Sequence, residues 1–105
     1  MTYKIDQSTS SIQDFFGILD YLTENLFSPT AARRFSNKLE TCYNHLINNP
    51  LIYPICRDET LAAKGFRLAP VMRYIVFYTV DEEKEIVRIH RILHGRMDYT
   101  HQEMG

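Results

Sequence analysis

Features that would point to several common protein classes are scarce or absent in this chain of 105 residues. It has only two cysteines, Cys42 and Cys56, and no basic start followed by an apolar run, so we expect two unpaired thiols in a reducing compartment. No stretch approaches the roughly 18 apolar residues that a membrane span needs. The sequence therefore predicts a soluble, cytoplasmic protein with no membrane partner.

A strong excess of one charge is also missing. The formal net charge is -1 at pH 7, which argues against a generally basic coat for nucleic acids. The hydrophobic fraction of 45% and the charged fraction of 24% are typical of a folded globular chain rather than a disordered one. At this length we expect one domain, residues 1–105, with a single core.

Motifs for metal, nucleotide and hydrolase chemistry are missing too. There is no glycine-rich phosphate loop, no Cys-x-x-Cys pair and no serine nucleophile elbow. His90 and His94 share a predicted strand, but the rise per residue separates them by about 13 Å, too far for one ion. We therefore predict no metal and no small-molecule cofactor.

Two predicted strands near the C-terminus are the clearest feature that is present. Residues 72–80 form a β-branched and aromatic run that is typical of a central strand. Residues 85–93 alternate between two faces: Val87, Ile89 and Leu93, interrupted by Arg91, on one, and Arg88, His90 and His94 mostly on the other. The polar linker 81–84 predicts that the two strands pair as an antiparallel hairpin.

The first half of the chain predicts a strand and two helices. Residues 2–6 alternate as a short strand, and a helix is predicted to start near Ser11, with Asp14 as a weak capping-box partner. Gly17 within this helix predicts a close packing contact or weak local stability. The predicted apolar stripe of this helix is Ile12, Phe15, Phe16, Leu19, Leu22 and Leu26.

A second helix is predicted to start at once, because Ser28 suits the N-cap and Pro29 the first helical position, and to end before Pro50. The short connection predicts an antiparallel helical hairpin. The predicted apolar face is Ala31, Ala32, Phe35, Leu39, Cys42, Tyr43, Leu46 and Ile47.

Residues 51–63 predict a loop with one helical turn near 58–63, and residues 65–69 predict a strand that Pro70 confines to an edge or an end. The order strand, helix, helix, strand, strand, strand predicts an α+β domain. We expect the helical hairpin to pack on one face of a small antiparallel sheet, and the other, open face to be the functional one.

Cations gather in and beside the predicted hairpin without intervening acids: Lys64, Arg67 and Arg73 before or at its first strand, and Arg88, Arg91 and Arg96 with His90 and His94 in or after its second. Such a face either binds an anionic partner or is a solvated surface paired with acids elsewhere. RNA cleavage by a 2′-hydroxyl needs a base, an acid and positive charge on the phosphate, and His94, Arg96 and Tyr99 are of suitable types. His94 is equally compatible with a structural role at the strand end.

The segments R-Y-I-V-F-Y-T-V at 73–80 and I-V-R-I-H-R-I-L-H-G-R-M-D-Y at 86–99 resemble the RelE/ParE superfamily of bacterial toxins, and the order of elements extends the resemblance over almost the whole chain. The resemblance implies growth inhibition, plasmid stabilisation and a cognate antitoxin whose flexible segment wraps and neutralises the toxin. RelE-like members cut messenger RNA on the ribosome, whereas ParE-like members inhibit DNA gyrase.

The chain departs from the RelE pattern, which usually opens the third strand with Tyr-Arg, since Tyr74 is followed by Ile75. The lysine-rich second strand of that group is also reduced to Lys64 and Arg67. These departures and the L-H-G-R-x-D ending favour a gyrase poison in which a cationic set binds the target or the antitoxin: Lys64, Arg67, Arg73 and Arg91. One alternative is a ribosome-dependent messenger RNA endoribonuclease that uses His94, Arg96 and Tyr99. Another is an inactive member that serves only as an antitoxin partner or repressor component.

Overall fold

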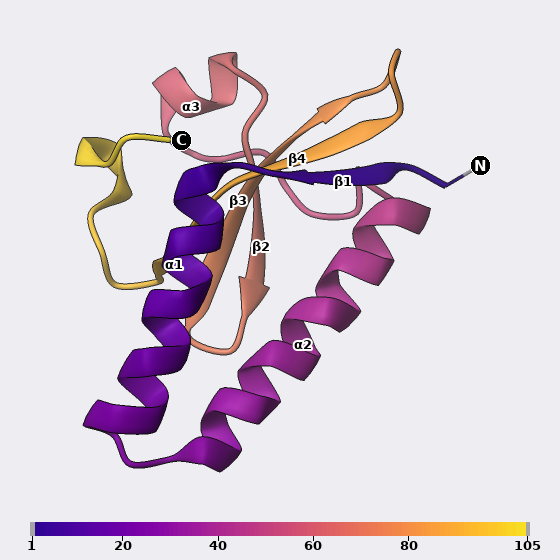
Figure 1. Cartoon of the computed structure of the whole chain (residues 1–105). Coiled ribbons are helices and arrows are strands. Elements are labelled where there is room, and N and C mark those ends of the chain that lie inside the picture. The colour runs from indigo at the N-terminus through magenta and orange to yellow at the C-terminus, as the bar shows by residue number, and fades with distance from the viewer. Residues whose placement is uncertain (1, 105) are drawn as a thin grey trace.

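The computed structural model describes residues 2–104, and their order of elements confirms the predicted α+β class (Figure 1). The elements are β1 (Lys4–Gln7), α1 (Thr9–Asp20), a π-helical turn η1 (Tyr21–Asn25), α2 (Pro29–Asn48), α3 (Glu59–Ala63), β2 (Arg67–Val71), β3 (Tyr74–Asp81), β4 (Ile86–His94) and a 3-10 turn η2 (Tyr99–His101). None of the helices in the described part of the chain is long and apolar enough to cross a membrane.

The sheet is mixed, with the strand order β1-β4-β3-β2. β2, β3 and β4 form an antiparallel meander, but β1 runs parallel to β4, with Lys4 opposite Ile86. The expectation of a wholly antiparallel sheet is therefore wrong for β1. Tight turns force the last three strands to alternate in direction, whereas two helices separate β1 from them and no turn fixes its direction. The central position of β3 and the edge position of β2 are confirmed.

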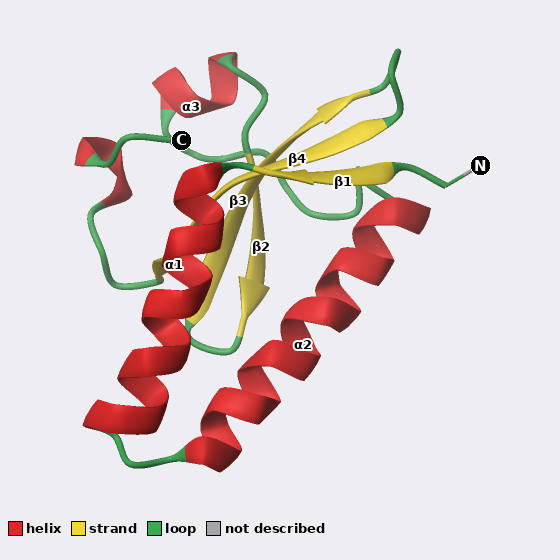
Figure 2. Ribbon diagram, viewed as in Figure 1, coloured by secondary structure: helices red, strands yellow, loops and turns green. Residues whose placement is uncertain are grey.

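The helices α1 and α2 form the predicted antiparallel hairpin over one face of the sheet (Figure 2). Ser28 caps α2, since its Oγ accepts a hydrogen bond from the Ala31 amide at 3.1 Å, and Pro29 begins the helix. Phe35 is fully buried beneath the hairpin, 5.1 Å from the ring of Tyr74. The side chains of α2 that are buried are Ala32, Phe35, Leu39, Cys42 and Leu46, all from the predicted apolar face.

The start of α1 differs from the prediction by one helical turn. Its N-cap is Ser8, whose Oγ accepts from the Ser11 amide at 3.0 Å and donates to the His90 carbonyl at 2.7 Å. Ser11 lies inside the helix and is buried. The local pattern favoured Ser11 because it could not show that Ser8 gains a second partner across the sheet.

The apolar stripe of α1 is rotated relative to the prediction. Ser11, Ile18 and Leu22 are buried and Phe15 packs against them, whereas the predicted members Ile12, Phe16 and Leu26 are exposed. No atom from outside the backbone of α1 lies within 4 Å of where a Cβ on Gly17 would be, so of the two alternatives predicted there, a close packing contact or weak local stability, the close contact is absent.

A β-bulge in β4 changes which side chains share a face. Tyr78 pairs with Ile89 and Phe77 with Arg91, so His90 is an additional residue inserted between these two pairs of the strand register. Before the bulge, Val87 and Ile89 pack toward the helices; after it, Ile92 does so, and Leu93 packs on the opposite face. The predicted grouping of Leu93 with Val87 and Ile89 is wrong, because one inserted residue shifts the alternation.

The face opposite the helical hairpin is half covered, which corrects the expectation of an open face. Phe77 and Leu93 are buried there beneath a second apolar cluster, completed by Cys56, Leu61 and Phe66, with Tyr99 and Met104 packed against it. Cys56, Leu61 and Phe66 come from the segment around α3, and Tyr99 and Met104 come from the C-terminal segment. Within residues 2–104, the part of this face near the β3–β4 turn stays open, and Thr79 and Arg88 line a groove there.

Candidate functional site

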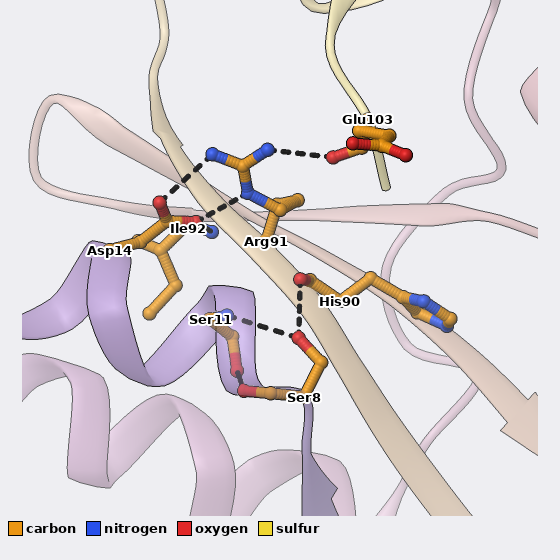
Figure 3. Close-up of polar contacts among 7 residues, drawn as sticks. All are labelled: Ser8, Ser11, Asp14, His90, Arg91, Ile92 and Glu103. Carbon is orange, nitrogen blue, oxygen red and sulfur yellow. Dashed lines mark hydrogen bonds and ion pairs between the residues drawn. The ribbon is translucent and has the colours of Figure 1, made fainter. Parts of the chain in front are cut away.

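An ion pair between α1 and β4 holds the predicted binding residue Arg91 in place (Figure 3). Arg91 Nε and one terminal nitrogen donate to the two carboxylate oxygens of Asp14 at 2.7 and 2.9 Å, and the other terminal nitrogen donates to the Glu103 carbonyl at 2.6 Å. The Ile92 amide also donates to Asp14 at 3.0 Å. The hydrogen bonds with Asp14 raise the pKa of Arg91, against the opposite effect of burial. Arg91 therefore joins α1, β4 and the C-terminal segment.

The L-H-G-R-x-D-Y ending folds into a compact turn after β4. The Gly95 amide donates to the Arg73 carbonyl at 2.8 Å, and a Cβ on Gly95 would lie 3.2 Å from that oxygen. The Arg96 amide donates to His94 Nδ1 at 3.1 Å, and Asp98 caps η2 by accepting from the Thr100 amide. Glycine at 95 thus allows the close approach of the β2–β3 turn, which brings Arg73 beside the ending.

The candidate catalytic residues His94 and Tyr99 lie on opposite faces of the sheet. The His94 ring meets Tyr74 edge-on at 5.4 Å on the side of the helices, whereas Tyr99 packs on Phe77 at 5.0 Å on the other side. Tyr74 and Phe77 belong to separate apolar clusters, one on each face. Arg96 is exposed in the turn between them. The structure therefore does not bring His94 and Tyr99 together.

The other predicted cations fall into two groups. Arg67 is half-buried and donates to the Tyr53 carbonyl at 2.6 Å, so it holds the loop before α3. Lys64 at the end of α3 and Arg73 in the β2–β3 turn are exposed, and within residues 2–104 neither forms an ion pair. Lys64 and Arg73, together with Arg96, are the members of the predicted sets that remain accessible to a partner.

Two grooves run beside these cations. The first, which we call the α1 groove, is largely apolar and lies between α1 and the end of β4; Gly17, Tyr21, Tyr74, His94 and Met97 are among its lining residues. The second, which we call the sheet groove, lies on the open part of the opposite face; Lys64, Phe66, Thr79, Arg88 and His90 line it together with the C-terminal segment.

Sequence reasoning missed the role of His90 in the sheet groove. Its side chain lies on the open face, as the alternation with Val87 and Ile89 predicted, where Nε2 lies 2.9 Å from Thr79 Oγ1 and the ring centroid lies 4.6 Å from that of Phe66. No local pattern showed these two contacts, since they depend on how β3 and the segment around α3 pack beside β4. Asp14 was likewise interpreted as part of a helix cap, although its partner is 77 residues away.

Among the residues that the structure describes, no group of three or more His, Cys, Asp or Glu side chains is placed to hold a metal ion. Cys42 and Cys56 are free and buried, as expected. Burial raises the pKa of each thiol to about 11, so neither is activated as a nucleophile near neutral pH.

A family model described as the ParE toxin of the type II toxin-antitoxin system, parDE, matches residues 5–99. The chain belongs to this family. Membership in the ParE family confirms the resemblance to the RelE/ParE superfamily and makes the chain a type II toxin. A search of curated proteins found no match.

Solved structures share the fold of this ParE-family chain at low identity. A chain of the toxin-antitoxin complex RelBE2 from Mycobacterium tuberculosis is 21% identical, with a TM-score of 0.64, over 90% of this chain and 99% of that one. A chain of the chromosomal ParDE system of P. aeruginosa is 15% identical, with a TM-score of 0.69, over 89% and 96%. A mutant of E. coli RelE in the free state is 14% identical, with a TM-score of 0.68, over 99% and 95%.

Proposed function

We propose that this ParE-family toxin stops growth in the cytoplasm by binding DNA gyrase, and that it does not cleave RNA. The observation that supports this is the separation of His94 and Tyr99 by the sheet. General acid–base cleavage needs its base, its acid and its phosphate-binding cation within hydrogen-bond reach of one phosphodiester. Apolar side chains packed around Phe77 and Leu93 also cover the part of the sheet face on which Tyr99 lies. Inhibition by binding needs no such convergence.

We also propose that a cognate antitoxin covers the α1 groove. Two of the similar structures come from toxin-antitoxin systems. The groove is largely apolar, and the exposed cations Arg73 and Arg96 lie in the turns at its end. An antitoxin segment with apolar side chains on one face and carboxylates at one end would match both features.

The antitoxin surface can be tested by charge reversal. Arg73→Glu combined with Arg96→Glu should abolish co-purification with the protein encoded beside the toxin gene, because the two carboxylates would repel an acidic segment. Arg57→Glu is the matched control, since Arg57 is exposed on a loop outside the groove. Equal loss in the control, or full retention in the double variant, would place the antitoxin elsewhere.

The target can be tested with the purified chain. Added to E. coli gyrase and relaxed plasmid, it should block supercoiling or trap cleaved DNA, while messenger RNA from cells that express it without antitoxin should show no new ends in primer extension. New cuts in the ribosomal A site that vanish on His94→Ala or Arg96→Ala would overturn the proposal. Normal growth with normal supercoiling would instead support an inactive family member.

A ribonuclease remains the second candidate, because the sheet groove gathers a histidine and two cations. His90 is oriented by Thr79, and Lys64 and Arg88 line the same groove. These are suitable groups for holding and cleaving a phosphodiester. If RNA is cut, His90→Gln should abolish cutting and His94→Gln should not.

A further inference from the structure

The exposed face of α2 carries three cations that have no acidic partner. Arg33, Arg34 and Lys38 are exposed, and within residues 2–104 none of them forms an ion pair. In Figure 1, α2 runs along one side of the molecule. A shallow depression on this face is lined by side chains of α2 alone: Thr30, Arg33, Arg34, Asn37, Lys38 and Thr41. We call these six residues the basic face.

The order of residues along α2 gives no structural reason for these cations. A solvated helix face is stabilised by acids three or four residues away from each Lys or Arg. None of the three cations has an Asp or Glu at either spacing. Arg34 and Lys38 are themselves four residues apart, and like charges at this spacing lower the stability of a helix. The fold therefore gains nothing from this set of charges.

The acids around α2 all lie outside the basic face. Glu40 belongs to α2 but lines a separate groove beside α1. Asp20 and Glu24 are exposed ahead of the α1–α2 turn, and within residues 2–104 neither forms an ion pair. The acidic β3–β4 turn lies near the C-terminal end of α2, about 14 Å of helix away from Lys38. The basic face thus has three positive charges and no negative one, although the whole chain has a net charge of -1.

The side chains of the basic face are of the types that contact phosphate oxygens. Arg, Lys, Thr and Asn supply many of the hydrogen bonds to the DNA backbone, and the guanidinium fork matches a phosphate group. No aromatic or large aliphatic side chain lines the basic face, whereas such side chains are the usual anchors of a protein interface. The six residues extend over about 16 Å of helix, which equals the rise of about five phosphates along one DNA strand. This chemistry fits a nucleic-acid backbone better than an acidic protein segment.

We propose that the basic face of α2 binds the phosphate backbone of duplex DNA without reading its base sequence. The choice of DNA over RNA rests on the proposed function, because gyrase works on duplex DNA and the toxin would meet the enzyme and its DNA together. The basic face shares no lining residue with the α1 groove. A contact with DNA therefore adds to the binding of gyrase and does not compete with an antitoxin in the α1 groove.

DNA binding can be measured without gyrase. The purified chain should bind a fluorescein-labelled duplex of about 20 base pairs with a Kd of about 10 µM or tighter at low salt, followed by anisotropy. Three phosphate contacts predict that binding weakens about 40-fold as salt rises from about 50 to about 200 mM. Arg33→Gln, Arg34→Gln and Lys38→Gln combined should remove most of this salt dependence, and Arg34→Gln alone about a third of it. Both variants should keep an equal or higher Tm, because the pair of like charges is gone.

The matched control removes three cations elsewhere on the surface: Lys4→Gln, Arg57→Gln and Lys84→Gln combined. These residues are exposed and lie outside the basic face. The net charge changes by the same amount as in the first triple variant, while the basic face stays intact. Binding of the duplex by the control should weaken by less than about threefold, since charges far from the contact are largely screened.

The outcomes separate this inference from the proposed function. Equal loss in the control, binding that does not depend on salt, or no binding by the wild-type chain would show that the basic face does not hold DNA. Tighter binding of single-stranded RNA, lost in the triple variant, would make RNA the ligand instead. Loss of the antitoxin with unchanged DNA binding would make the basic face a protein interface, which also contradicts the proposal. A chain that binds DNA but leaves gyrase active refutes the proposed function alone, and one that inhibits gyrase without binding DNA refutes this inference alone.

Discussion

The two ends of α1 have opposite effects on the stability of the fold. At the N-terminal end, Ser8 and Asp14 use their oxygens to bind β4, and the pair of Asp14 with Arg91 is only 14% and 16% exposed. At the C-terminal end, the helix widens into a π-helical turn and terminates in Phe27, strained and exposed. The first end stabilises the fold, and the second lowers its stability. Stability lost at a defined, accessible place is the pattern expected of a surface kept for binding.

The largest loss of stability should come from removing the contacts of Asp14 at the N-terminal end of α1. Asp14→Ala leaves the Arg91 guanidinium largely buried without a counter-charge and the Ile92 amide without an acceptor. We expect a loss of about 3 kcal/mol in the free energy of unfolding, measured by urea denaturation.

Asp6→Ala is the control for Asp14→Ala, because Asp6 also pairs with an arginine of β4. That pair, with Arg88 at 2.8 Å, is 44% and 52% exposed. Its loss should change the free energy of unfolding by less than about 1 kcal/mol. If both variants lose the same amount, burial is not what makes the Asp14 pair strong.

A smaller effect at the same end should follow Ser8→Ala. This variant loses the N-cap of α1 and the hydrogen bond to the His90 carbonyl, so we expect a loss of about 2 kcal/mol. Ser28→Ala removes only the cap of α2 and should cost about 1 kcal/mol. Equal losses in the two denaturation curves would contradict a role for the bond across the sheet.

At the C-terminal end of α1, a substitution should raise the free energy of unfolding instead of lowering it. Phe27→Gly relieves the left-handed strain and should stabilise the fold by up to about 1 kcal/mol, less the backbone entropy that glycine loses on folding. Calorimetry should therefore show an equal or higher Tm than for the wild-type chain. A clearly lower Tm would remove the contrast between the two ends.

The smallest effect concerns pH and the buried thiols. Burial raises the pKa of Cys42 from 9.0 to about 11, so between these values the folded chain retains a proton that the unfolded chain has lost. Stability from this thiol is complete below pH 9 and is lost as the pH rises through 11. At pH 9 the loss should be about 0.4 kcal/mol. Comparison of urea midpoints at pH 7 and pH 9 should show a smaller decline in Cys42→Ala.

Local signals that agree with one another were enough to predict α2 and β3. Ser28 and Pro29 mark the start of α2, its apolar face has a regular period, and the β-branched and aromatic run of β3 suits a buried central strand. Asp58 also caps the short helix that was expected near residues 58–63.

The misinterpreted features depend on contacts between distant segments. Ser8 caps α1 in place of Ser11 because its hydroxyl also donates to the carbonyl of His90, 82 residues away. The bulge in β4 exists only in the register of that strand with β3. The grouping of His94 with Arg88 and His90 on one face was wrong for the same reason: alternation in a strand assigns faces correctly only until an inserted residue reverses them. The sequence did not predict the left-handed backbone at Phe27, because glycine is the usual residue at that position after a helix end.

The edges of the sheet decide how this protein behaves when no partner covers it. Pro70 has no amide hydrogen to offer along β2, and the segment from Pro54 to Cys56 already bonds the start of that strand, with the Leu68 amide donating to the Pro54 carbonyl at 3.1 Å. The opposite edge, β1, has only four residues. Neither edge is a good template for a further strand, so we expect the chain to resist growth into fibrils even when no antitoxin covers it.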